Sequence, residues 1–188
     1  MSAVRAELWW MPVGAGGHVV VHTSRWWELV RARREHRHPR PLFHAALEVI
    51  ADAHRTVIEM TPAWGQPADA SGVVREGPVG LRPLGRWRLF RYEVRAWPDG
   101  AIPDRAYAVD SPTAIPLTPA ARDALFASLA EVPPLTWGRP VVPGGDMWNS
   151  NAVISWLLTR AGVDATRLSP PRGGSAPGWS AGIALGAD

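Results

Sequence analysis

Ser150 and His44 are the two residues of this sequence whose types and settings point to chemistry. Ser150 lies between Asn149 and Asn151 at the start of a segment with helical spacing of apolar residues, and His44 lies in an earlier strand-like segment. A serine hydroxyl becomes a nucleophile when a neighbouring histidine takes its proton during attack on a carbonyl carbon. The pair therefore predicts hydrolysis or acyl transfer at an amide or ester, provided that the fold brings the two side chains together.

The segment after Ser150 predicts an amphipathic helix. Its apolar side chains recur three and four residues apart, at Val153, Ile154, Leu157, Leu158 and Ala161. Because Ser150 lies on the same stripe, we expect its hydroxyl to face the core, where the free N–H groups of the first turn could stabilise an oxyanion. Asn149 and Asn151 are the candidate side-chain donors. The alternative is structural, since serine and asparagine are preferred helix caps and a cap needs no chemistry.

A β-hairpin is predicted where two strand-like segments flank Asp52-Ala53. With a two-residue turn, Glu59 of the second strand lies diagonally from His44 of the first on one face. A loop one residue longer would move Glu59 to the other face. Glu59 is therefore the candidate third residue of the site, placed to orient His44.

A histidine strand, a second strand with an acidic residue and a late helix opening on Asn-Ser-Asn together resemble one branch of the papain-like superfamily. This is the circularly permuted NlpC-type branch, which includes relatives of lecithin:retinol acyltransferase. Leu42–Val49 is similar to its histidine strand and Asn149–Leu158 to its nucleophile helix, as in bacterial members with serine at the thiol position. The resemblance implies an α+β fold, with an antiparallel sheet or half-barrel packed against the late helix. It also implies that Ser150 attacks, His44 is the base and Glu59 orients it.

The exchange of cysteine for serine leaves two functions open. A thiol near a helix start readily gives a thiolate, whereas a hydroxyl must lose its proton during the attack. The chain is then either a serine-based hydrolase or acyltransferase for a small-molecule, peptide or acyl substrate, or an inactive binding or scaffold module that kept the fold. Trp26, Trp27, Trp148 and Trp156 are expected to fill the core, and Trp148 is also placed to wall a substrate pocket.

Other motifs carry weaker predictions. Gly178-Trp179-Ser180-Ala181-Gly182 matches a hydrolase nucleophile motif, but that motif needs a preceding strand and a later histidine, and no histidine follows His54. We expect Trp179 to anchor this segment against the body. On a strand, His18 and His22 would lie about 13 Å apart, too far for one metal. His36 and His38 have no acidic or thiol ligands nearby, so no metal or cofactor is expected.

The run from Arg31 to Arg40 is strongly basic. A solvated helix end followed by a loop is its expected structure. An RNA or phosphate site is the third and weakest function, because no aromatic residue interleaves the arginines to stack on bases. A nucleic-acid partner is therefore not expected.

The apolar patterns and turn residues predict the following elements. Strands are expected at 7–11, 18–22, 42–50, 56–60 and 88–97, and helices at about 23–34, 119–131 and 149–161. In 88–97, apolar residues alternate with Arg91, Glu93 and Arg95, which predicts a half-buried strand. From about 169 the chain is rich in proline and glycine and is expected to be irregular, with a short strand at 183–185.

The composition fits a single α+β domain over residues 1–188. All 20 basic residues are arginine, as in GC-rich bacterial genomes, and the net charge is only +3. The absence of cysteine excludes disulfides, thiolate metal sites and a thiol nucleophile. Glu7 interrupts the apolar N-terminal segment and no apolar run approaches the roughly 20 residues of a membrane span, so we expect a cytoplasmic protein without a transmembrane segment.

Overall fold

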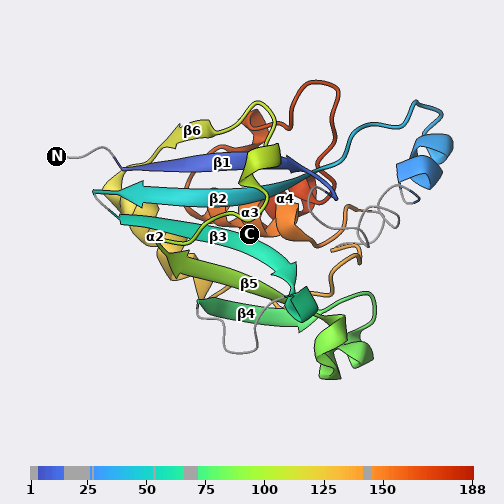
Figure 1. Cartoon of the computed structure of the whole chain (residues 1–188), viewed down its shortest axis with the longest axis horizontal. Helices are drawn as coiled ribbons and strands as arrows, with labels where there is room; N and C mark the ends of the chain where they lie inside the picture. The colour runs from blue at the N-terminus through green and yellow to red at the C-terminus, as the bar shows by residue number, and fades with distance from the viewer. Residues whose placement is uncertain (1–3, 15–25, 27, 53, 66–71, 142–144) are drawn as a thin grey trace.

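The computed structural model describes residues 4–14, 26, 28–52, 54–65, 72–141 and 145–188. Their fold is α+β, with one six-stranded antiparallel sheet in the order β4-β5-β3-β2-β1-β6 (Figure 1). The strands are β1 (Arg5–Pro12), β2 (Phe43–Ala51), β3 (His54–Pro62), β4 (Val73–Pro78), β5 (Arg91–Pro98) and β6 (Thr113–Pro116). Short 3-10 turns are η1 (Ala63–Gly65), η2 (Arg82–Arg86), η3 (Arg88–Phe90), η4 (Arg105–Tyr107) and η5 (Ala165–Arg167).

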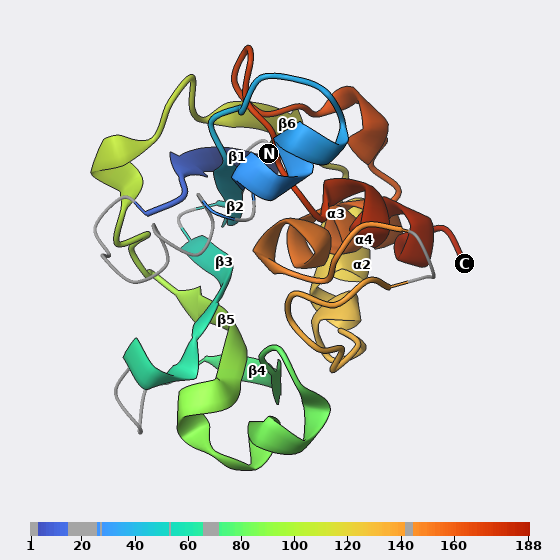
Figure 2. The same ribbon diagram turned by 90° about the vertical axis from the view of Figure 1, so that its right-hand side faces the viewer.

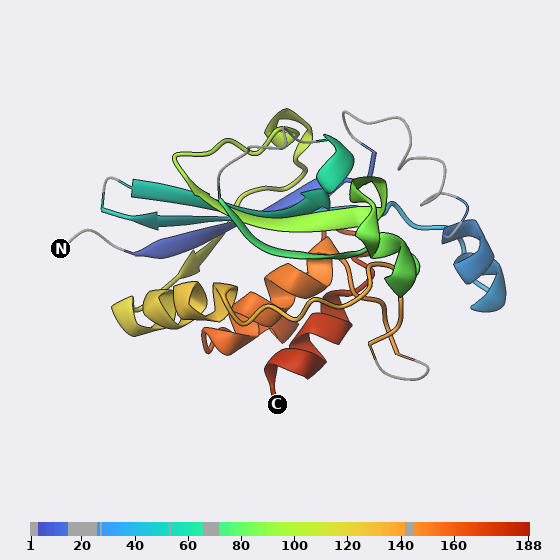
Figure 3. The same ribbon diagram turned by 90° about the horizontal axis from the view of Figure 1, so that it is seen from below.

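Three helices, α2 (Pro119–Leu129), α3 (Ser150–Arg160) and α4 (Trp179–Gly186), cover one face of the sheet (Figure 3). A further helical stretch spans residues 28–34 and lies beyond the end of the sheet. None of the described helices is long and apolar enough to cross a bilayer.

α3 is the central helix, because every residue from Ser150 to Leu158 is buried between the sheet and the other helices. Its contact with α4 is close: a Cβ added at Gly182 would lie 2.0 Å from the Ala152 carbonyl oxygen. Only glycine therefore lets the two helix backbones approach this far.

The two faces of the sheet have separate apolar clusters. The helix-side core takes alternate residues of β2, including Phe43, Ala45 and Leu47. The other face, which we call the outer face, carries a smaller cluster of Trp9, Met11, Ala46, Val57 and Ile102. A strand residue between two core residues therefore belongs to the outer face.

The hairpin prediction is confirmed. β2 and β3 pair from Leu47–Ile58 to Ala51–His54, which leaves a two-residue turn at 52–53. Asp52 adopts the left-handed conformation that such turns require, with φ of 54°.

The strand at 7–11 and the helices at 119–131 and 149–161 are also confirmed as β1, α2 and α3. Thr118 caps α2 by accepting a hydrogen bond from Ala121 N at 3.1 Å. The predicted strand at 18–22 and the start of the helix at 23–34 lie outside the described residues.

Several predictions are wrong. The segment from 169 is not irregular throughout, since α4 forms there, and residues 183–185 are helical instead of extended. Residues 88–90 form η3, so β5 begins only at Arg91. β5 is buried on both faces, because Glu93 and Arg95 form an ion pair at 2.5 Å instead of facing solvent.

The tryptophans divide between core and surface. Trp148 and Trp156 are buried as predicted, whereas Trp26 is 71% exposed and so does not fill the core. Trp179 is buried, with its ring centroid 5.0 Å from that of Trp10, and anchors α4 as expected.

Candidate functional site

Asn149 is the N-cap of α3. Its Oδ1 accepts a hydrogen bond from Ala152 N at 3.1 Å, the third N–H beyond the cap. Ser150 is the first residue inside the helix. The capping interpretation therefore applies to Asn149 and not to Ser150.

Asn151 fastens the start of α3 to β2. Its Oδ1 accepts from Ala45 N at 2.8 Å and its Nδ2 donates to Phe43 O at 3.0 Å. These two peptide groups flank His44. The β2–β3 pairing begins only at Leu47, so the Asn151 amide satisfies backbone groups that a neighbouring strand would otherwise satisfy.

The segment before α4 also contacts the start of α3. The Pro177 carbonyl accepts hydrogen bonds from Asn149 Nδ2 and from Asn151 Nδ2, both at 2.8 Å. The next residue, Gly178, has φ of 89°, and a Cβ there would lie 2.2 Å from Asn149 Oδ1. We call Asn149, Asn151 and Pro177 the asparagine clasp, because they join β2, α3 and the segment before α4.

Ser150 is buried, with 6% of its surface exposed, and its hydroxyl makes no hydrogen bond among the described residues. The backbone N–H groups of Ser150 and Asn151 belong to the first turn, where helices have no internal acceptor. They are therefore the oxyanion donors that the site offers.

The side-chain amides have less to offer as oxyanion donors. Asn151 Nδ2 already donates to two carbonyl oxygens, those of Phe43 and Pro177. Asn149 Nδ2 donates to Pro177 and keeps one N–H. Asn151 is thus a positioning residue, whereas Asn149 retains one donor for an anion.

His44 lies on the outer face of β2, since its neighbours Phe43 and Ala45 both enter the helix-side core. Burial lowers the pKa of His44 to about 4, so the imidazole is neutral at neutral pH and able to accept a proton. The clasp holds the start of α3 at the backbone of residues 43–45, but α3 covers the opposite face of the sheet, so the structure does not bring the Ser150 and His44 side chains together. Within the described part of the chain no hydrogen bond joins His44 to Ser150.

Glu59 lies on β3, opposite Arg95 of β5, and on the outer face like His44. Burial, together with the charge of Asp104, raises the pKa of Glu59 to about 7, although Arg95 opposes the shift. Its Oε1 is buried without a hydrogen-bond partner among the described residues. The hairpin thus gives Glu59 the predicted face, and no hydrogen bond from it to His44 is formed.

The outer face holds further buried polar groups that the sequence did not reveal. Glu48 accepts from Arg105 at 3.4 Å, yet its Oε2 has no described partner. Trp9 Nε1 and Thr61 Oγ1 are buried and unpartnered as well. Together with Glu59 Oε1, these make four buried side-chain atoms on the outer face without a hydrogen-bond partner among the described residues. Such a concentration is typical of places where water or a polar ligand is bound.

Trp148 is fully buried. Its indole N–H donates to the Tyr92 hydroxyl at 3.1 Å, and that hydroxyl donates to Leu135 O at 2.8 Å. Trp148 thus completes a buried chain of hydrogen bonds in the core.

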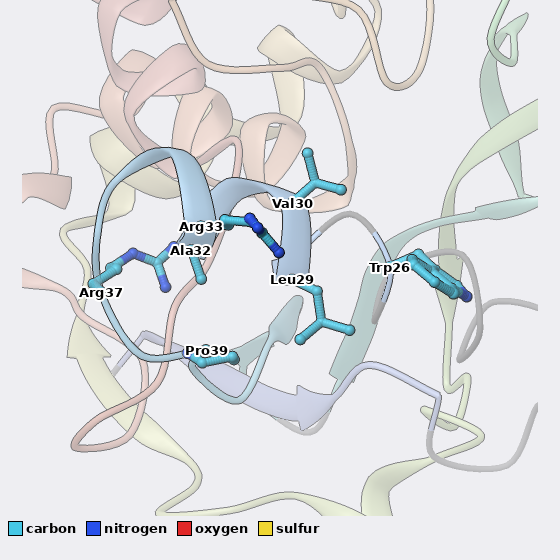
Figure 4. Close-up of a pocket in the computed structure, with 7 residues that line it drawn as sticks. All are labelled: Trp26, Leu29, Val30, Ala32, Arg33, Arg37 and Pro39. Atoms are coloured by element: carbon cyan, nitrogen blue, oxygen red, sulfur yellow. The ribbon is translucent and has the colours of Figure 1, made fainter.

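Two cavities of the described chain lie away from these residues. The larger, of about 500 Å³, is formed on the helical stretch 28–34, as Figure 4 shows. The smaller, of about 320 Å³, lies beside β4 and η2. Within the described residues, no group of three or more histidine, aspartate or glutamate side chains could hold a metal.

The hydrolase motif at 178–182 and the basic run at 31–40 both have structural roles. Ser180 is exposed and its hydroxyl donates to Asp146 at 3.2 Å, while Gly178 before it is a helix cap and no strand. In the basic run, Arg31 and Arg37 pair with Glu35, and Arg37 also pairs with the buried Glu28.

Comparison of the chain with protein-family models, with curated proteins and with solved structures gave no match.

Proposed function

We propose that this protein carries out acyl transfer at an amide or ester through Ser150, with the permuted papain-like layout that its sequence resembles. One observation carries the proposal. Of the three polar residues at the start of α3, Asn149 caps the helix and Asn151 fastens it to β2, whereas the Ser150 hydroxyl makes no hydrogen bond within the described chain. A buried serine without a hydrogen bond of its own, at a helix start whose first N–H groups have no internal acceptor, supports a role in nucleophilic attack.

The proposed reaction has two steps. As Ser150 Oγ bonds to the carbonyl carbon, His44 takes the hydroxyl proton and the first-turn N–H groups hold the oxyanion. Protonated His44 then gives this proton to the leaving amine or alcohol, which leaves an acyl-serine. Water or a second acceptor releases the acyl group by the same sequence in reverse order.

Attack requires the imidazole within about 3 Å of the hydroxyl. His44 leaves β2 on the face opposite α3, so we propose that substrate binding shifts the start of β2, where it is not paired with β3, and brings the imidazole to Ser150. Glu59 then lies behind His44 on the outer face.

A non-catalytic binding module is the second candidate. The observation that favours it is the missing Ser150–His44 hydrogen bond, together with the asparagine clasp, which serves the fold without any chemistry. In that case substitution of Ser150 leaves function unchanged.

Labelling with a fluorophosphonate probe separates the two. We expect the wild-type protein to be labelled, and the Ser150→Ala and His44→Ala variants to lose the label. Ser180→Ala is the matched control, because Ser180 is the exposed serine of the rival motif and its loss should leave labelling intact. A folded wild-type protein that takes no label would leave the binding module as the function.

A further inference from the structure

An exposed apolar patch surrounds the turns η2 and η3. Trp64, Leu81, Trp87 and Leu89 are each between 46% and 62% exposed. We call these four residues, with Arg82 and Arg86, the Trp87 patch. Figure 2 shows η2 and η3 projecting from the β4–β5 edge of the sheet, away from the three helices. Soluble proteins seldom leave large apolar side chains gathered in this way without a binding role.

The patch is held by hydrogen bonds of its own backbone. Leu84 N donates to Leu81 O, Trp87 N to Leu84 O and Phe90 N to Trp87 O, at distances of 2.9 to 3.0 Å. The Trp87 ring packs edge-on against Phe90 at a centroid distance of 6.5 Å. The apolar side chains are thus presented by a chain segment that is already ordered.

The charge of the patch is positive. Arg82 forms no ion pair among the described residues, and Arg86 makes only a cation–π contact, with its guanidinium 3.8 Å from the Trp87 ring centroid. Behind them, Arg91 and Arg82 line the cavity of about 320 Å³, whose one acidic residue, Glu76, is paired with Arg91 at 3.0 Å. The hollow therefore offers Arg82, which has no acidic partner among the described residues, as a group suited to binding a phosphate.

We propose that the Trp87 patch docks this protein on the surface of a bilayer rich in anionic phospholipid. Tryptophan and leucine enter the interfacial region, while arginines reach the charged headgroups. Two alternatives fit less well. The exposed leucines cannot stack on nucleic-acid bases as aromatic rings do. A second copy of the chain would bring a like-charged patch against this one.

A second cluster faces the same end of the molecule. The helical stretch 28–34 exposes Leu29 and Val30 next to Trp26, with exposed Arg33 beside them. Figures 1 and 3 place this stretch and the turns η2 and η3 toward the same end of the sheet, and Figure 2, which looks onto that end, shows the stretch at the top and the turns at the bottom.

Vesicle co-sedimentation tests the proposal. The wild-type protein should sediment with vesicles of phosphatidylcholine containing 30% phosphatidylglycerol and stay in solution with pure phosphatidylcholine. Arg82→Gln/Arg86→Gln should lower the partition coefficient about 25-fold, at about fivefold per arginine. Trp87→Ala/Leu89→Ala should abolish sedimentation even in low salt.

Two control variants test whether the loss of positive charge or of an exposed ring elsewhere on the protein has the same effect on vesicle binding. Arg167→Gln/Arg172→Gln removes two exposed positive charges at and after the end of η5, and Tyr107→Ala removes an exposed ring from η4, so both should bind as wild type does. Because all substituted side chains are exposed, unfolding curves should match. Equal loss in the controls, equal binding to neutral vesicles, or no vesicle binding would each overturn the proposal. Binding of a single-stranded oligonucleotide without vesicle binding would assign the patch to nucleic acid instead.

Discussion

At the scale of single residues, Ser150 differs from Asn149 and Asn151 because its side chain makes no hydrogen bond among the described residues. Whether its position favours a negative charge can be tested by placing a thiol there. The chain has no cysteine, so Ser150→Cys introduces the only thiol. First-turn N–H groups favour the thiolate. We expect the pKa of that thiol to fall below the ordinary value of about 8.5. The pH dependence of iodoacetamide alkylation measures it.

Ser169→Cys provides the reference, because residue 169 is exposed in a loop. Its thiol should titrate at the ordinary value. If both thiols titrate alike, or if the one at position 150 titrates higher, the helix start does not favour an anion and the nucleophile proposal fails.

His44 and Glu59 predict opposite dependences of stability on pH. Burial lowers the pKa of His44 from 6.5 to about 4, so the unfolded chain binds the proton first and the free energy of unfolding rises between those values. Burial raises the pKa of Glu59 from 4.5 to about 7, so the folded chain keeps its proton longer and the free energy of unfolding falls over that range. Each effect amounts to about 3 kcal/mol.

The two slopes offset each other in the wild type from about pH 4.5 to 6.5. Glu59→Gln should leave only the rise, and His44→Gln should leave only the fall. Urea unfolding midpoints measured from pH 4 to 8 show both. A flat profile in Glu59→Gln would mean that burial does not lower the pKa of His44. A flat profile in His44→Gln would mean that burial does not raise the pKa of Glu59.

At the scale of elements, the asparagine clasp predicts that two side-chain-to-backbone contacts contribute unequally to the free energy of unfolding. Asn151→Ala leaves Ala45 N and Phe43 O without partners in a buried setting, which should lower the free energy of unfolding by about 3 kcal/mol. Thr118→Ala removes only the exposed cap of α2 and should cost about 1 kcal/mol. Urea titration compares them, and equal costs would show that the clasp contributes no more than a cap.

The α3–α4 contact predicts a steric effect. Gly182→Ala brings a methyl group against the Ala152 carbonyl and should destabilise the fold by about 1–3 kcal/mol. Ala184→Gly, on the exposed side of α4, is the comparison, since it changes helix propensity without touching α3. Limited proteolysis should release α4 faster in Gly182→Ala, and equal rates in the two variants would contradict the steric argument.

The elements differ in how well the sequence predicts them. The β2–β3 hairpin follows from two apolar segments and a two-residue turn, and α2 from Thr118 followed by a proline at the first helical position. α4 was missed because its eight residues include glycines at 182 and 186, which weaken any isolated helix. Packing against α3 stabilises it, and that contact is not visible in the local sequence.

At the scale of the whole molecule, the candidate site is only partly predictable. The buried stripe of α3 and the shared face of His44 and Glu59 follow from the periods of helix and strand. The asparagine clasp does not, because it joins residues more than 100 positions apart. The burial of Glu93 and Arg95 was missed for a similar reason, since alternation reports which residues share a face and not what covers that face.

The separation of Asn151 from Phe43, 108 residues, has a consequence for synthesis of the chain. A ribosome adds about 5–20 residues per second, so about 5–20 s pass between the emergence of the two partners. During that time the edge of β2 at His44 lacks the Asn151 amide, and the Pro177 carbonyl follows later still. An unpaired strand edge invites pairing with other chains. A chaperone that covers extended segments during translation should therefore raise the yield of folded protein more than one supplied after release.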